Sequence, residues 1–134
     1  MLDVANEVFQ AIATKVRSEH PGTTVRGEFL REETEFPAVS LDEVRNVTVD
    51  HLEDSSNEEK YAGVTYRLQT SSNKQGGRKA EARAIFATAD AEMRRLGLRR
   101  VTYTTTPDIY NSTVYSITAT YEGVISAEGY VYSR

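Results

Sequence analysis

Residues 71–97 read SSNKQGGRKAEARAIFATADAEMRRLG and place one patterned helix between two strand-like segments. Gly76 and Gly77 interrupt the preceding strand, and after Arg78 an apolar residue recurs every three or four positions, which predicts an amphipathic helix. Gly97 predicts the helix end, because glycine readily adopts the left-handed conformation found there. The predicted apolar stripe comprises Ala82, Ile85, Phe86, Ala89, Met93 and Leu96. The predicted solvent face carries Glu81, Arg83, Asp90, Glu92, Arg94 and Arg95.

The segments on either side of this helix have strand patterns. Residues 61–69 alternate, with Ala62, Val64, Tyr66 and Leu68 on one face, which is typical of a half-buried strand. Residues 101–106 and 113–125 are rich in Thr, Tyr, Val and Ile and are separated by turn-forming residues, so they predict an antiparallel pair. The local unit is therefore strand, helix and hairpin.

A second amphipathic helix is predicted at the N-terminus. Its apolar face comprises Leu2, Ala5, Val8, Phe9, Ile12, Ala13 and Val16, and His20, Pro21 and Gly22 end it. We expect this face to cover the protein's own sheet, although a helix held out for a partner has the same pattern. Residues 23–29 and 36–44 predict two short strands joined by the charged turn LREETE. The fold class predicted is α+β: one small domain over residues 1–134, with a mixed or antiparallel sheet and two amphipathic helices packed on it.

Composition narrows the classes of protein. A chain of 134 residues is of ordinary size for one domain. It has no cysteine, which excludes disulfides, thiolate metal sites and a thiol nucleophile. No run approaches the roughly 18 apolar residues that a membrane span requires, and no basic head precedes an apolar stretch at the N-terminus. These features predict a soluble, unsecreted protein without a membrane partner.

Charge is divided unevenly along the chain. Residues 1–60 carry 14 acidic and 6 basic side chains, whereas residues 61–134 carry 6 acidic and 10 basic ones. The two halves can neutralise each other within one subunit. Alternatively, the acidic side of one subunit faces the basic side of the next, as a head-to-tail ring requires, because a heterologous contact closes only when two different patches match.

Residues 46–60 form an acidic stretch longer than the usual connection of about 4–6 residues. A loop that orders against a partner and a plain solvated loop both fit this composition. A metal site fits poorly, because the carboxylates lack the alternating positions and central glycine of a calcium loop, and one histidine is not a transition-metal site.

Catalytic and nucleotide-binding motifs are not recognised. His20 stands at a helix end and His51 in the acidic stretch, and neither belongs to a nucleophile motif, so both are interpreted as solvated surface histidines. The sequence GGRKAE could cradle a phosphate on backbone amides, but it is not a phosphate-binding loop of the G-x-x-x-x-G-K-[ST] type, and a turn with a helix start explains it equally well. Basic residues gather at both ends of the predicted central helix: Lys74, Arg78, Lys79 and Arg83 at its start, and Arg94, Arg95, Arg99 and Arg100 at its end.

The order of these features from residue 36 to residue 134 resembles the tail-terminator proteins of long-tailed, non-contractile phages and prophages of Gram-positive bacteria. The resemblance covers about three quarters of the chain. It is carried by the segment FPAVSLDEV, a polar loop, a strand that ends in Ser72 and Asn73, the helix start KAEA and a paired-strand ending with TVYSITATYEGVIS. The matching positions at the helix exit are Asp90, Met93, Leu96, Gly97 and Arg99, followed by Pro107.

The resemblance implies a virion structural protein and no enzymatic activity or cofactor. Such a protein forms a ring, commonly of six subunits, that caps the tail tube, stops its polymerisation and presents the surface for head–tail joining. The implied partners are further copies of the chain, the tail-tube protein and the head-connector protein, with DNA passing through the ring without specific binding. The implied location is the virion tail, after assembly in the host cytoplasm. Candidate partner-interface residues are Asp50, His51, Glu53, Asp54, Glu58, Glu59, Lys74, Arg78, Lys79, Arg99 and Arg100.

Two other classes remain open. A head-closure or head–tail adaptor protein has a similar size and element order. A nucleic-acid-binding module would use the basic ends of the central helix, although a net charge of −4 lowers nonspecific affinity for phosphate chains.

Overall fold

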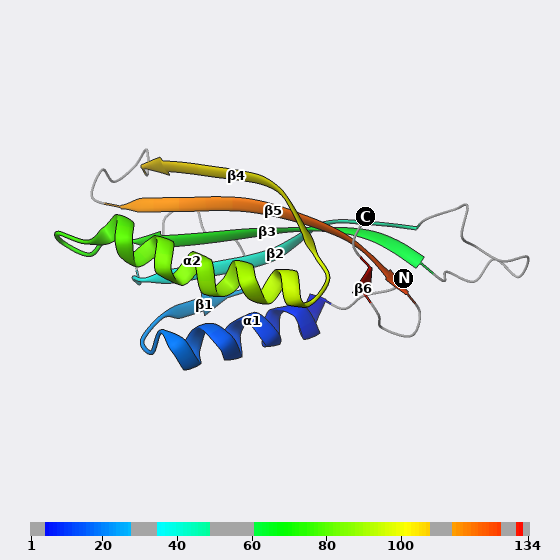
Figure 1. Cartoon of the computed structure of the whole chain (residues 1–134), viewed down its shortest axis with the longest axis horizontal. Helices are drawn as coiled ribbons and strands as arrows, with labels where there is room; N and C mark the ends of the chain where they lie inside the picture. Colours follow the sequence, from blue (N-terminus) through cyan, green and yellow to red (C-terminus); the bar gives the residue numbers. More distant parts are fainter. Residues whose placement is uncertain (1–4, 28–34, 49–60, 108–113, 127–130, 133–134) are drawn as a thin grey trace, which may run out of the picture.

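The computed structural model describes residues 5–27, 35–48, 61–107, 114–126 and 131–132 of the chain. Two helices and six strands form in these residues (Figure 1). In chain order they are α1 (Ala5–Glu19), β1 (Thr24–Arg26), β2 (Ala38–Thr48), β3 (Tyr61–Ser72), α2 (Arg78–Arg95), β4 (Arg99–Pro107), β5 (Tyr115–Ser126) and β6 (Val131–Tyr132).

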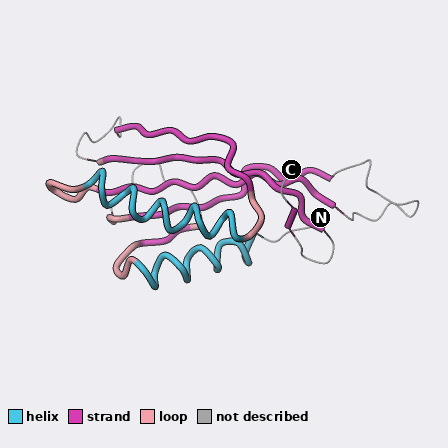
Figure 2. Tube along the Cα trace, in the orientation of Figure 1, coloured by secondary structure: helices cyan, strands magenta, loops and turns pink. Residues whose placement is uncertain are grey.

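One mixed sheet forms the centre of the fold. Five strands run in the order β1-β2-β3-β5-β4, and the short β6 pairs with one end of β5. β1 is parallel to β2, and all other pairs are antiparallel. Both helices lie on one face of this sheet, with α2 along β3 and β5 and α1 beside α2 (Figure 2). The α+β prediction, with a mixed sheet and two packed helices, is confirmed.

The alternating strand pattern fixes which side chains face the helices. Ala62, Val64, Tyr66 and Leu68 of β3 are all buried, as their spacing predicts. In β5 the residues that pair with them are also buried or are glycine, because antiparallel register keeps paired residues on one face. The intervening positions form the opposite face, which no described element covers.

The helices supply the other half of the core. The α2 stripe is buried as predicted, except that Leu96 is only partly buried. In α1, Val8, Ile12, Ala13 and Val16 are buried, and all of these except Ala13 join the same cluster. The expectation that the first helix covers its own sheet is therefore confirmed, while the predicted Leu2 lies outside the described residues. Burial of these side chains is the main favourable term for this fold.

The end of α2 follows the prediction made from Gly97. Its φ is +93°, and its amide donates to the carbonyl of Arg94 at 3.0 Å while the amide of Leu98 donates to that of Met93 at 3.1 Å. This pair of bonds is a Schellman motif, which satisfies carbonyls that the helix leaves free. The chain then turns directly into β4.

Three sequence interpretations need correction. Glu92 was predicted on the solvent face but is only 8% exposed, because α1 packs against that side of α2. The strand predicted at 36–44 runs to Thr48, since Asn46 and Val47 pair with Val64 and Gly63 of β3. The acidic connection is thus shorter than residues 46–60, because pairing with a neighbouring strand overrides the weak strand preference of a residue such as Asn46.

Candidate functional site

The acidic half of the predicted interface lies outside the described residues. This applies to Asp50, His51, Glu53, Asp54, Glu58 and Glu59. The structure places the points at which the chain enters and leaves that segment. Thr48 pairs with Ala62, next to Tyr61, so both points lie at one end of the β2–β3 pair (Figure 1).

The basic residues at the C-terminal end of α2 all pair with carboxylates of the same subunit. Arg94 and Arg100 contact the two carboxylate oxygens of Asp90 at 3.2 and 3.3 Å. Arg95 pairs with Glu92, and Arg99 lies 3.7 Å from Glu122 of β5. Arg99 and Arg100, which the sequence assigned to a partner interface, therefore have intramolecular carboxylate partners.

Asp90 is the centre of a polar network between α2 and the sheet. Its Oδ1 accepts a hydrogen bond of 2.5 Å from the phenol of Tyr121, and Arg100 donates to the same oxygen. Burial raises the pKa of Tyr121, and its bond to the Asp90 carboxylate raises it further. Tyr121 is a neutral donor in this network, which gives it a structural function.

The basic residues at the N-terminal end of α2 differ in having no ion-pair partner among the described residues. Within the described part of the chain, no carboxylate forms an ion pair with Lys74, Arg78, Lys79 or Arg83. All four side chains are exposed. Lys79 and Arg83 are also four residues apart on the helix, where two like charges repel each other.

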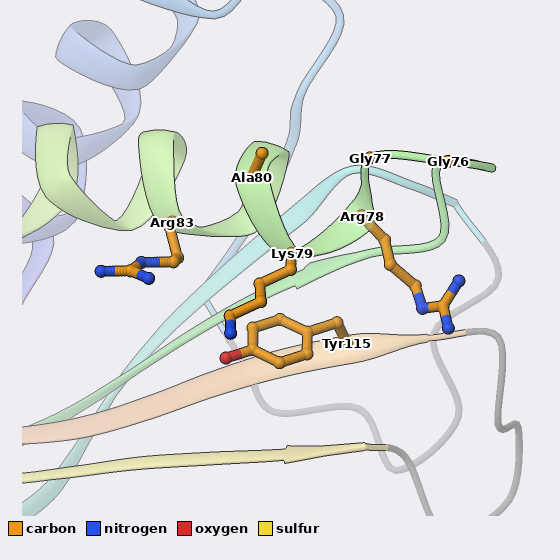
Figure 3. A pocket seen from close by; sticks show the side chains of 7 residues that line it. All are labelled: Gly76, Gly77, Arg78, Lys79, Ala80, Arg83 and Tyr115. Carbon is orange, nitrogen blue, oxygen red and sulfur yellow. The ribbon is translucent and has the colours of Figure 1, made fainter.

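Three of these cations, Arg78, Lys79 and Arg83, line a pocket between the start of α2 and the start of β5. The pocket has a volume of about 600 Å³ and is lined by Gly76, Gly77, Arg78, Lys79, Ala80, Arg83 and Tyr115. Figure 3 shows the side chain of Lys79 running beside the ring of Tyr115, with Arg78 and Arg83 on either side. We call this the cationic pocket. The sequence indicated its basic residues, whereas Tyr115 joins them only because β5 returns beside β3, where Tyr115 pairs with Ser72.

The exposed large apolar side chains identify a second candidate surface. Among the described residues they are Val44 and Val47 on β2 and Val101 and Tyr103 on β4, each between 42% and 47% exposed. β4 is an edge strand, and β1 pairs only with the beginning of β2, from Ala38 to Ser40. The sequence pattern does not indicate the exposure of Val44 and Val101, because both lie at β-bulges, where the register shifts by one residue.

The histidine interpretation is partly wrong. His20 is half-buried, and its Nε2 lies 2.8 Å from Oγ1 of Thr88, so it connects the end of α1 to α2 instead of standing in solvent. His51 lies outside the described residues. In the portion of the chain that the structure describes, no three His, Cys, Asp or Glu side chains are grouped as a metal site would need.

No protein-family model and no curated protein sequence shows a significant match to the chain. None of the described helices has the length and apolar character needed to span a membrane.

Proposed function

We propose that this chain is a structural protein of a phage virion, a tail terminator that forms a ring on the end of the tail tube. The proposal combines the resemblance of residues 36–134 to that family with one structural observation. The observation is the pair of strand edges on opposite sides of the sheet, which carry the exposed large apolar side chains of the described residues. We call them the β2 edge, with Val44 and Val47, and the β4 edge, with Val101 and Tyr103.

Two different edges suit a head-to-tail contact. β2 is antiparallel to β3, β3 to β5, and β5 to β4, so β2 and β4 run in opposite directions. The β4 edge of one copy can therefore pair with the β2 edge of the next as an antiparallel extension of the sheet. A heterologous contact of this kind generates a ring when the rotation between copies closes.

Strand pairing and burial of apolar side chains would stabilise this contact, and no chemical reaction is needed. An unpaired strand edge presents backbone donors and acceptors to another chain, and pairing satisfies them. Burying the exposed apolar side chains adds about 25 cal/mol for each Å² removed from water. Bulges at Val44 and Val101 limit pairing to a partner whose edge has a matching shape, which opposes random aggregation.

The remaining parts of the proposal follow from the family resemblance. The ring, commonly of six subunits, binds the last layer of tail-tube protein, stops its polymerisation and presents a surface to the head connector. DNA passes through the ring without specific binding, and the protein is located in the virion tail. A head-closure or head–tail adaptor protein would share the ring and differ in its place in the particle.

Electron microscopy of the purified chain mixed with tail-tube protein of the same phage tests this proposal. We expect rings at the ends of tubes and tubes that stop growing once capped. The variant Val101→Lys should abolish capping, because it places a charge on the β4 edge, whereas Thr104→Lys on the uncovered face of the same strand should retain it. Tubes that grow equally with and without the chain would refute the proposal.

A nucleic-acid-binding module is the second candidate, and the cationic pocket with its aromatic ring favours it. In a mobility-shift assay at 150 mM salt, this alternative predicts retardation of single-stranded DNA that is lost in Lys79→Glu. The tail-terminator proposal predicts no retardation.

A further inference from the structure

The two groups of basic side chains on α2 differ in a way that only the structure reveals. At the C-terminal end, Arg94, Arg95 and Arg100 are held by Asp90 and Glu92. At the N-terminal end, the cationic pocket collects like charges with no carboxylate partner in the described residues. Such clustering raises the free energy of the isolated subunit, and an anionic ligand would remove the repulsion.

The acidic segment at residues 49–60 is anchored too far away to neutralise the pocket. That segment, residues 49–60, is anchored at Thr48 and Tyr61, whereas the pocket follows Ser72 at the other end of β3. The 12 residues of β3 separate the two ends by about 40 Å at roughly 3.3 Å per residue. A connection of this length anchored at both ends reaches only about 20 Å from its anchors.

In the proposed ring, the same geometry gives two unlike rims. Copies joined through the β2 and β4 edges all point the same way, so every cationic pocket lies on one rim and every acidic segment leaves from the opposite rim. Segments 49–60 of the ring therefore do not reach the pockets. The layer that adjoins the pocket rim can supply an acidic ligand for them.

We infer that the cationic pocket binds the carboxylates of an acidic segment of the different protein that forms this adjoining layer. This inference rests on the proposed function for the identity of the layer, but the binding chemistry belongs to the pocket alone. Lys79 and Arg83 are one helical turn apart, with Cβ atoms about 5–6 Å apart. Alternate residues of an extended peptide project to the same side at about 6–7 Å, so two carboxylates of one segment can meet both cations.

The net charge of the chain favours a peptide over a nucleic acid. In the pocket of about 600 Å³, Tyr115 offers an apolar surface for the methylene groups of acidic side chains. A polynucleotide would bring its whole phosphate chain against a protein of net charge −4.

Binding of a synthetic acidic peptide to the full chain tests the inference. The probe is HLEDSSNEEK, the sequence of residues 51–60, and its matched control is HLQNSSNQQK, in which every carboxylate side chain is an amide. By fluorescence anisotropy at low salt, we expect the acidic peptide to bind with a Kd on the order of 0.1–1 mM, because exposed ion pairs are individually weak. Salt at 0.5 M should weaken binding at least tenfold.

Charge-reversal variants locate the site. Lys79→Glu and Arg83→Glu should each weaken peptide binding about tenfold or more, whereas Arg17→Glu, an exposed reversal on α1, should leave it within about twofold. Circular dichroism of each variant checks that it remains folded. Equal binding of the amide peptide, or equal loss in Arg17→Glu, would overturn the inference.

Three further outcomes also contradict it. If the acidic peptide does not bind, the pocket is not a carboxylate-binding site. If an oligonucleotide of matched charge binds more tightly than the peptide, the pocket is a nucleic-acid-binding site. Self-association of the wild-type chain that Lys79→Glu abolishes would make a second copy the donor of the segment. The peptide assay uses free protein, so a negative result there would not contradict the ring proposal. A failure to cap tubes would contradict the ring proposal but not peptide binding at the pocket, and only the identity of the adjoining layer would then be lost.

Discussion

The phenol of Tyr121 and the carboxylate of Asp90 join the middle of β5 to α2 through a hydrogen bond of 2.5 Å. Tyr121 is fully buried, and Asp90 also holds Arg94 and Arg100. The contact therefore links the core of the sheet to the charged end of the helix. It also fixes the rotation of α2 on the sheet, because both partners are anchored in regular structure.

Removing this hydroxyl should destabilise the fold measurably. Tyr121→Phe removes a buried hydrogen bond to a charged acceptor, and we expect a loss of about 1–2 kcal/mol in the free energy of unfolding by urea. The loss is no larger because Arg94 and Arg100 still pair with Asp90. Tyr103→Phe is the control, because Tyr103 is 45% exposed, and it should change stability by less than about 0.5 kcal/mol. Equal stability of Tyr121→Phe and wild type would show that the bond contributes nothing.

The same residue predicts a pH dependence at the alkaline limit. The folded pKa of Tyr121 is raised above its unfolded value of about 10, so the folded state retains a proton that the unfolded chain loses. The resulting stabilisation is fully present below pH 10 and declines as pH rises above it. Urea unfolding at pH 8 and pH 11 should show a smaller alkaline loss of stability in Tyr121→Phe than in wild type. An identical loss in both proteins would contradict this assignment.

Glu92 illustrates what the sequence pattern leaves out. Its position on the helix predicted a solvent-exposed charge. Exposure of a helix flank depends on what packs beside it, and α1 packs beside this flank of α2. In contrast, three features depend on local periodicity and backbone conformation and were predictable. They are the apolar stripe of α2, the end of α2 at Gly97 and the alternation of buried side chains in β3.

The candidate site was less predictable than the core. Its cations stood out in the sequence, but only the register of β4 and β5 shows that Arg99 meets Glu122 while Lys79 meets no carboxylate in the described residues. The parallel pairing of β1 with β2 and the two bulges likewise depend on contacts between distant residues. No local pattern encodes these contacts.

Glu92 should contribute stability that acid removes. Its bond to Arg95 lowers the pKa of Glu92 below 4.5, so the stabilisation is present above that value and is lost as pH falls through the folded pKa. We expect Glu92→Gln to be less stable than wild type at pH 7 and to approach it at pH 3. Thermal unfolding at both pH values checks this, and a constant difference between the proteins would refute it.

The packing of α1 on the core can be tested with one truncation. Ile12 is fully buried, so Ile12→Ala should lower the free energy of unfolding by about 2–5 kcal/mol through lost burial and a residual cavity. Val44→Ala, at a side chain 47% exposed, should cost less than about 1 kcal/mol. A small effect at Ile12 would mean that α1 is detached from the sheet in solution.

The strand edges predict a complementation that distinguishes a head-to-tail contact from a symmetric one. Val47→Lys should disable the β2 edge and Val101→Lys the β4 edge, because each places a charge where the neighbouring copy must pack. Each variant alone should sediment as a monomer. Mixed together, the intact β4 edge of Val47→Lys can pair with the intact β2 edge of Val101→Lys, and the mixture should give a 1:1 dimer that grows no further, since no intact edge remains exposed. Analytical ultracentrifugation measures this directly, at protein concentrations where the wild type assembles. A symmetric contact through one edge would instead leave one of the two variants able to dimerise by itself, and that result would exclude the proposed ring geometry.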